Sequence, residues 1–118
     1  MYAEIKLYSA KGDELTVPML ATASTPIRFK MLFGKDLMGG ILTSNLSGDG
    51  FDLSVVEIVS QLAFLMAQQA AKADITTLDM NKYISWLDDF DSNAFIDNAN
   101  EILNVYIKSR NNTSRAKK

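Results

Sequence analysis

The sequence predicts an α+β fold: a mainly α-helical domain of about five helices that begins with a small β-hairpin. Two patterns of apolar residues predict it. Apolar residues alternate with polar ones up to about residue 20, as in strands, and recur every three or four residues from about residue 26 onward, as in helices. The length of 118 residues predicts one domain. We expect it to occupy residues 1–107 and to be followed by a flexible basic tail at 109–118.

The β-hairpin is expected at about residues 2–20. Two runs of alternating apolar residues flank the turn sequence AKGD at 10–13. The apolar positions are Ile5 and Leu7 in the first run, and Leu15, Val17 and Met19 in the second. Pro18 has no N–H to donate, so the second strand should lie at an edge of the sheet or end near this residue.

Two short helices are expected next, at about 26–33 and 36–43. Thr25 is a suitable N-cap with Pro26 at the first helical position, and Gly34 is a natural C-terminal stop. Two adjacent glycines weaken the second of these helices and could turn it into a bend.

The longest helix is expected at about 54–72, where Ser54 and Glu57 have the spacing of a capping box. One side of this helix carries Val55, Ile58, Val59, Leu62, Leu65 and Met66. The opposite side carries Phe64 among polar residues and alanines. A helix that is apolar on most of its circumference is either central in the core or covered by a partner, and both interpretations stay open.

Two further helices are expected at about 79–90 and 92–108, with Asp79 and Asp91 as their N-caps. The apolar positions of the first are Met80, Tyr83, Ile84, Leu87 and Phe90. Those of the second are Phe95, Ile96, Ala99, Ile102, Leu103, Tyr106 and Ile107. Both sets follow the helical period, so each helix should pack one face against the core.

The charge of the chain is unevenly distributed. Residues 108–118 hold five basic side chains and no acidic one, while residues 1–107 hold seven basic and fourteen acidic side chains, a net charge of −7. An acidic body argues against binding to a phosphate backbone. The most apolar stretch, residues 55–73, is interrupted by charged and amide side chains, which argues against a membrane span. We expect no signal peptide, and a cytosolic location is the simplest interpretation of a chain without cysteine.

Catalysis is not predicted. The chain has no cysteine and no histidine, which removes thiolate and imidazole nucleophiles and the usual zinc sites. Asp88 and Asp89 are adjacent, so on a helix their side chains diverge by about 100° and do not converge on one substrate atom. No cofactor motif is present, and we expect no enzyme activity and no cofactor.

A calcium loop was the strongest alternative for the acidic stretch. Asp89, Asp91 and Asn93 have the spacing of positions 1, 3 and 5 of an EF-hand. The loop requires glycine at position 6 and glutamate at position 12, where this chain has Ala94 and Asn100. Helix capping explains the same residues better, so we expect no metal site.

Partner binding is the function that the apolar residues favour. Phe64 lies on the less apolar side of its helix, Trp86 lies at the margin of its apolar arc, and Phe33 ends a short helix. Contiguous apolar surface of this kind marks binding sites. Phe33, Phe64 and Trp86 are therefore our candidate contact residues, and ordinary core packing is the alternative for each.

Three stretches resemble the small tail assembly chaperones of long-tailed bacteriophages and prophages. They are TPIRFKMLFGKDL at 25–37, VVEIVSQLAFLMAQQA at 55–70 and YISWLDDFD at 83–91. The resemblance implies a mostly helical, non-enzymatic protein of the host bacterial cytoplasm that is absent from the mature virion. It also implies binding to the tape measure protein, which is kept soluble while tail tube subunits polymerise around it. Many such proteins are made in two lengths by ribosomal frameshifting.

The mechanism expected from this resemblance is helix-in-groove recognition. A groove formed by helices at 55–72, 79–90 and 92–107 would accept amphipathic helices of the tape measure protein. The tail tube protein and a second copy of the chain are further possible partners. Three other classes stay open: a calcium-binding regulator, a small regulator that uses its basic tail on nucleic acid, and a structural tail component.

Overall fold

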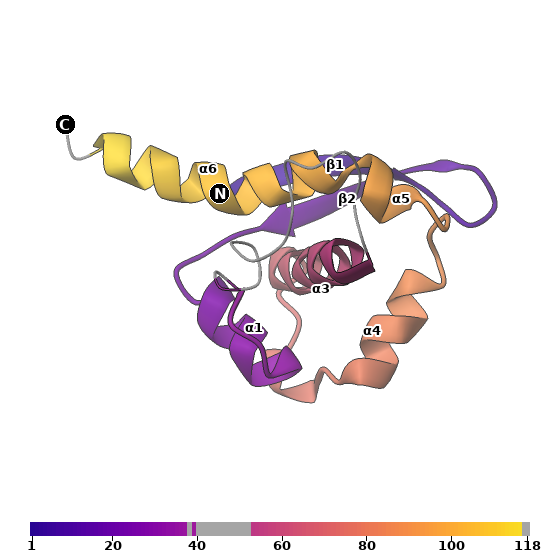
Figure 1. The fold of residues 1–118 in the computed structure, drawn as a ribbon, viewed down its shortest axis with the longest axis horizontal. Coiled ribbons are helices and arrows are strands. Elements are labelled where there is room, and N and C mark those ends of the chain that lie inside the picture. The colour runs from indigo at the N-terminus through magenta and orange to yellow at the C-terminus, as the bar shows by residue number, and fades with distance from the viewer. Residues whose placement is uncertain (38, 40–52, 117–118) are drawn as a thin grey trace.

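The computed structural model describes residues 1–37, 39 and 53–116. Within them, one two-stranded antiparallel sheet precedes five α-helices, so the predicted α+β fold with an N-terminal hairpin is confirmed. The strands are β1 (Tyr2–Tyr8) and β2 (Glu14–Leu20). Figure 1 shows α3 (Leu53–Ala70) nearly end-on in the middle, with the hairpin and α6 (Ala99–Ala116) on one side of it. On the other side lie α1 (Thr25–Phe33) and α4 (Met80–Leu87).

The hairpin closes at the predicted turn. Gly12 adopts φ +95°, a conformation that favours glycine, and its N–H donates to the carbonyl of Ser9 at 2.9 Å. The Ser9 hydroxyl accepts hydrogen bonds from the N–H groups of Lys11 and Asp13 at 3.2 and 3.0 Å. On the inner face Ile5, Leu7 and Met19 are buried, as the alternation predicts, whereas Leu15 is exposed and Val17 is half-buried.

The register of the hairpin decides which backbone groups face outward. Met1 and Ala21 exchange two hydrogen bonds, at 2.6 and 2.9 Å, and therefore form a hydrogen-bonded pair. Alternate pairs follow, so the even-numbered residues of both strands direct their N–H and C=O groups away from the partner strand. On the outer edge of β2 this set includes Pro18, which lacks an N–H, as expected of an edge strand.

The outer edge of β1 receives a distant part of the chain. The carbonyl of Tyr8 accepts a hydrogen bond from the N–H of Asp91 at 2.9 Å, and the N–H of Ala10 donates to the carbonyl of Asp89 at 3.0 Å. Between them Ser9 forms a bridge with Phe90. The segment after α4 is thus fixed to the hairpin.

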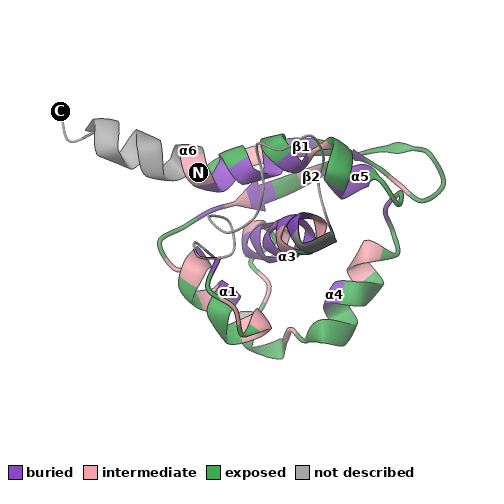
Figure 2. Cartoon of the chain, in the orientation of Figure 1, coloured by how far each residue is buried: buried purple, intermediate pink, exposed green. Residues whose placement is uncertain are grey.

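The core surrounds α3, which explains why this helix is apolar on most of its circumference. Its buried residues are Val55, Val59, Ser60, Gln61, Leu62, Ala63, Phe64, Leu65, Met66 and Gln69. Figure 2 shows this helix as largely buried, whereas the outer sides of α1 and α4 are exposed. The buried amide of Gln69 accepts a hydrogen bond from the hydroxyl of Thr25 at 3.2 Å and donates to that of Thr22 at 3.1 Å, which ties α1 and the end of β2 to α3.

The start of α1 differs from the prediction. Ser24 occupies the N-cap position, and Thr25 is the first helical residue. The Thr25 side chain is buried, and its hydroxyl accepts a hydrogen bond from the N–H of Thr22 at 2.9 Å. The predicted end is confirmed, since Gly34 adopts φ +70° and its N–H donates to the carbonyl of Lys30 at 2.8 Å.

The middle of the chain can be compared only in part. The short helix expected at 36–43 falls largely outside the described residues. The long helix begins at Leu53, one residue before the expected start, so Ser54 lies inside its first turn. It ends at Ala70, and Lys72 in the left-handed region (φ +58°) turns the chain away.

The last two predicted helices need correction. α4 is capped by Asp79 as predicted, but it ends at Leu87 instead of residue 90, because the next residues bond to the hairpin. The helix expected at 92–108 is divided into α5 (Ala94–Asp97) and α6. Asn98 separates them, since its side-chain N–H donates to the carbonyl of Ala94 at 2.9 Å and so competes with the helix backbone.

Two further predictions concern the ends of this region. Asp91 does not cap a helix; its carboxylate accepts a hydrogen bond from the N–H of Asn93 at 3.0 Å in the preceding turn, and Asn93 is the N-cap of α5. α6 continues to Ala116, through most of the segment expected to be a tail at 109–118. No glycine or proline interrupts the chain between 99 and 116.

Candidate partner-binding surface

A chain of aromatic rings connects α1, α3, α4 and α5. Phe33 contacts Tyr83 edge-on, with 5.3 Å between the ring centroids, and Tyr83 contacts Phe64 at 5.6 Å. Phe64 in turn contacts Trp86 at 5.5 Å, and Trp86 lies 4.7 Å from Phe90. These distances are typical of stabilising aromatic pairs. The rings therefore hold α4 against the central helix.

The three predicted contact residues belong to this chain of rings but differ in exposure. Phe64 is only 1% exposed, because α4 crosses over it, so the structure places its ring in the interior. Trp86 and Phe33 are half-buried and keep part of their surface accessible. Phe64 and Trp86 are in direct contact, whereas Phe33 reaches them only through Tyr83. Of the three, Trp86 and Phe33 remain candidates for direct contact with a partner.

A shallow groove lies beside Trp86, between α3 and α4; we call it the Trp86 groove. Its volume is about 500 Å³, and it is lined by Phe64, Gln68, Leu78, Asp79, Asn81, Lys82, Ser85, Trp86 and Asp89. The ammonium group of Lys82 donates to the carbonyl of Thr77 at 2.7 Å, which holds this side chain along the α3–α4 connection. Polar residues thus surround a small apolar floor.

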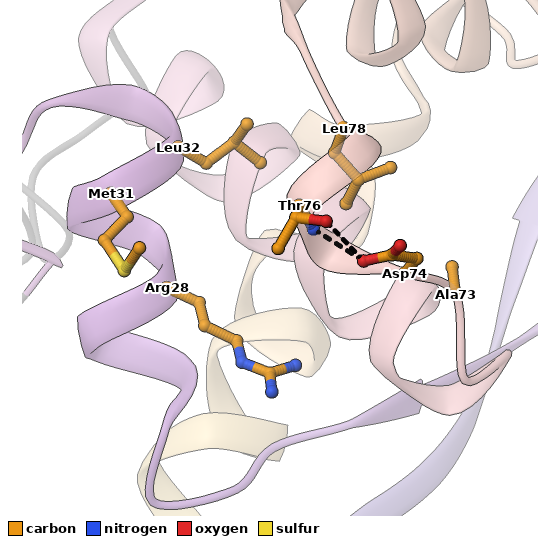
Figure 3. Close-up of a pocket in the computed structure, with 7 residues that line it drawn as sticks. All are labelled: Arg28, Met31, Leu32, Ala73, Asp74, Thr76 and Leu78. Atoms are coloured by element: carbon orange, nitrogen blue, oxygen red, sulfur yellow. Dashed lines mark hydrogen bonds between the residues drawn. The ribbon is translucent and has the colours of Figure 1, made fainter.

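A second groove lies between α1 and the connection from α3 to α4; we call it the α1 groove. Its volume is about 640 Å³. It is lined by Arg28, Met31, Leu32, Ala73, Asp74, Thr76 and Leu78 (Figure 3). Leu78 lines both grooves, so the two are neighbours around the start of α4.

Exposed apolar side chains occur on the two helices that border these grooves. On α1, Ile27 and Met31 are 63% and 80% exposed; on α4, Met80 and Ile84 are 45% and 51% exposed. Each pair has i, i+4 spacing and therefore lies on one face of its helix. Sequence reasoning missed this surface, because it assigned the whole apolar arc of α4 to the core. The i, i+4 repeat of Ile27 and Met31 was the available signal.

The charged groups of the α1 groove have unequal partners. The Asp74 carboxylate accepts hydrogen bonds from the Thr76 hydroxyl at 2.6 Å and the Thr76 N–H at 3.0 Å, and these bonds lower the pKa of Asp74. Within the described part of the chain, no hydrogen bond or ion pair engages the guanidinium of Arg28, which is half-buried. The groove therefore offers one free cation beside apolar side chains.

The carboxylates of the acidic stretch do not gather into a cluster in the part of the chain that is described. There, no group of three or more histidine, cysteine, aspartate or glutamate side chains is placed to hold a metal ion. None of the described helices has the length and apolar character to span a membrane. Comparison of the chain with protein-family models, curated proteins and solved structures found no match.

Proposed function

We propose that this protein is a tail assembly chaperone of a long-tailed bacteriophage or prophage. It binds amphipathic helices of the tape measure protein, keeps that protein soluble and promotes polymerisation of the tail tube around it. The observation that carries the proposal is the exposure of an apolar face on α1 and another on α4, the first of which contributes Met31 to the α1 groove. The sequence resemblance supplies the identity of the partner.

The chemistry of this surface suits a binder of many related helices. Met31 and Met80 are flexible and polarizable, so they adapt to different apolar side chains. Burying apolar surface contributes roughly 25 cal/mol per Å², although ordering the partner offsets part of this gain. A long, repetitive tape measure protein presents many amphipathic segments of different sequence. An adaptable surface can cover each of them.

The acidic body supports the same role. Residues 1–107 carry a net charge of −7 and the whole chain carries −2, so the repulsion between copies is concentrated on this body. The protein would act in the host cytoplasm during assembly, without catalysis, and would leave before the virion is complete. The tail tube protein is a second expected partner, since polymerisation has to begin on the covered tape measure protein.

The central test is co-purification with the tape measure protein. Met31→Asp combined with Met80→Asp places two charges on the apolar faces and should weaken binding at least tenfold, a free-energy change of about 1.4 kcal/mol. Trp86→Ala should weaken binding through the neighbouring groove. Thr16→Asp, at an exposed position of the hairpin, is the matched control.

Two results would contradict the proposal. One is unchanged binding by the double variant while its circular dichroism spectrum matches the wild type. The other is the protein in stoichiometric amounts in purified particles, which would make it a structural tail component. A tail tube gene upstream and a very long tape measure gene downstream are the expected gene neighbours.

A further inference from the structure

Arg28 is the feature of the α1 groove that apolar binding alone does not explain. Its side chain lines the same groove as Met31, Leu32 and Leu78, and Figure 3 shows its guanidinium extending from α1 on the side of the groove away from the two leucines. An arginine in this setting is partly removed from water without a protein partner to replace the lost hydrogen bonds. A ligand that supplies such a partner gains the interaction without first breaking another one.

Asp74 lies in the same groove but is engaged elsewhere. One of its carboxylate oxygens accepts both hydrogen bonds from Thr76, and Figure 3 shows the side chain turned toward that residue. Among the described residues the ion pairs are Lys6 with Glu14 and Lys35 with Glu57, so Arg28 is not paired with Asp74. The free guanidinium is therefore available to a group from outside the chain.

We propose that the α1 groove selects amphipathic helices that carry a carboxylate beside their apolar stripe, and that Arg28 binds this carboxylate. The inference rests on the proposed function and specifies the chemistry of the helices that are bound. A planar guanidinium matches a carboxylate in a two-point hydrogen-bonded pair. The apolar side chains of α1 continue the groove for one turn beyond Arg28. We therefore infer that the occupant is a protein helix, which can present a carboxylate and an apolar residue one turn apart.

The spacing of the groove predicts the spacing in the partner. Arg28 is separated from Met31 and Leu32 by three and four residues, which is one turn of α1. A bound helix that runs alongside α1 should place its aspartate or glutamate three or four residues from a large apolar residue. Helices of the tape measure protein with a lysine or glutamine at that position should bind more weakly.

The test uses two labelled synthetic peptides of about 18 residues, above the length at which isolated helices become marginal. Each has an apolar stripe of leucines; one carries a glutamate beside the stripe, and the other carries a glutamine there. Fluorescence anisotropy should show the glutamate peptide binding the wild type roughly three- to tenfold more tightly, as expected for a half-exposed charged hydrogen bond. With Arg28→Gln this preference should disappear, and Arg28→Lys should retain only part of it.

The outcomes separate this inference from the proposed function. Equal affinity of the two peptides for the wild type, or no binding of either, overturns the role of Arg28. If the wild type still co-purifies with the tape measure protein in either case, the chaperone proposal stands. Co-purification by the Met31 and Met80 double variant tests that proposal separately. Binding of N-acetylglutamate as tightly as the glutamate peptide would show that the apolar stripe contributes nothing and would overturn the helix inference.

Discussion

At the scale of single residues, Tyr83 joins the central helix to the helix that covers it. Its hydroxyl lies 2.6 Å from the hydroxyl of Ser60, which also donates to the carbonyl of Glu57 at 2.9 Å. Tyr83 can therefore act as the donor to Ser60. Burial raises the pKa of Tyr83, and a hydrogen bond donated by Ser60 to the phenolate would offset only part of this effect. The neutral phenol is the form that the fold requires.

Replacing this hydroxyl should change how stability depends on pH. Below about pH 10 the phenol is neutral in both states, and its bond to Ser60 contributes about 1 kcal/mol. As the pH rises further, the unfolded chain ionises first, so the wild type loses stability until the pH exceeds the raised pKa of the folded state. Tyr83→Phe should be less stable near neutral pH but should lose less stability in alkali.

Urea unfolding at neutral and alkaline pH measures this difference. Tyr8→Phe is the control, because it removes an exposed phenol from the same chain. If Tyr83→Phe and the wild type lose the same amount of stability in alkali, the buried phenol is not the titrating group.

The sequence predicts the residues of the surface less well than their helices. The period of α3 places Phe64 away from the main stripe, and that much is correct. Whether the ring is exposed depends on where α4 crosses, which is set by contacts between elements that are distant in sequence. In the same way, Met80 and Ile84 share an arc with Tyr83, yet only Tyr83 is buried, because α4 covers α3 along one narrow line.

At the scale of elements, the two ends of α4 carry aspartates in different roles. Asp79 caps the helix: its carboxylate accepts a hydrogen bond from the N–H of Lys82 at 2.9 Å. Asp88 follows the last helical residue, and the carboxyl end of a helix disfavours negative charge. The carboxylates around α4 therefore do not share one role, because the position of each along the helix determines its effect.

Substitution by alanine should separate these roles. Asp79→Ala removes the cap and should lower the free energy of unfolding by about 1 kcal/mol. Asp88→Ala, the matched control, should change it by no more than about 0.5 kcal/mol, because an exposed aspartate at the carboxyl end contributes little. Thermal and urea unfolding measure both variants. Equal losses in the two would show that Asp79 does not stabilise α4 as a cap.

Elements that depend on local chemistry could be predicted, and those that depend on distant contacts could not. The hairpin turn with Gly12, the stop at Gly34 and the cap at Asp79 are each encoded within a few residues. The early end of α4 depends on the hydrogen bonds of Asp89 and Asp91 with the hairpin at the other end of the chain. The break at Asn98 is a competition between side chain and backbone that the apolar stripe of 95–107 conceals.

At the scale of the whole molecule, the hairpin is the element whose edges differ most. The outer edge of β1 is occupied over its last residues by the segment 89–91. The outer edge of β2 directs the backbone of Glu14, Thr16, Pro18 and Leu20 away from β1. Pro18 interrupts this row of donors, which protects an edge strand from pairing with another molecule.

Pro18→Thr should therefore increase self-association. The substitution restores an outward N–H and makes the donor row of β2 continuous, so two copies can pair edge to edge. Sedimentation velocity over a range of concentrations should show more dimer than in the wild type. Adding Thr16→Pro opens a new gap in the row and should return the protein to wild-type behaviour. If Pro18→Thr sediments like the wild type at every concentration, the proline does not protect this edge.

The pairing of Tyr8 with Asp91 limits how early the hairpin can complete its contacts during synthesis. The two residues that share this hydrogen bond are separated by 83 positions, and nothing nearer in sequence takes their place in the described structure. At roughly 5–20 residues per second, the ribosome needs on the order of 4–17 s to deliver the second after the first. During that interval the backbone groups of Tyr8 and Ala10 at the outer edge of the hairpin lack their later partners. In a cell that makes this protein in quantity, neighbouring nascent chains must be kept from pairing with this edge.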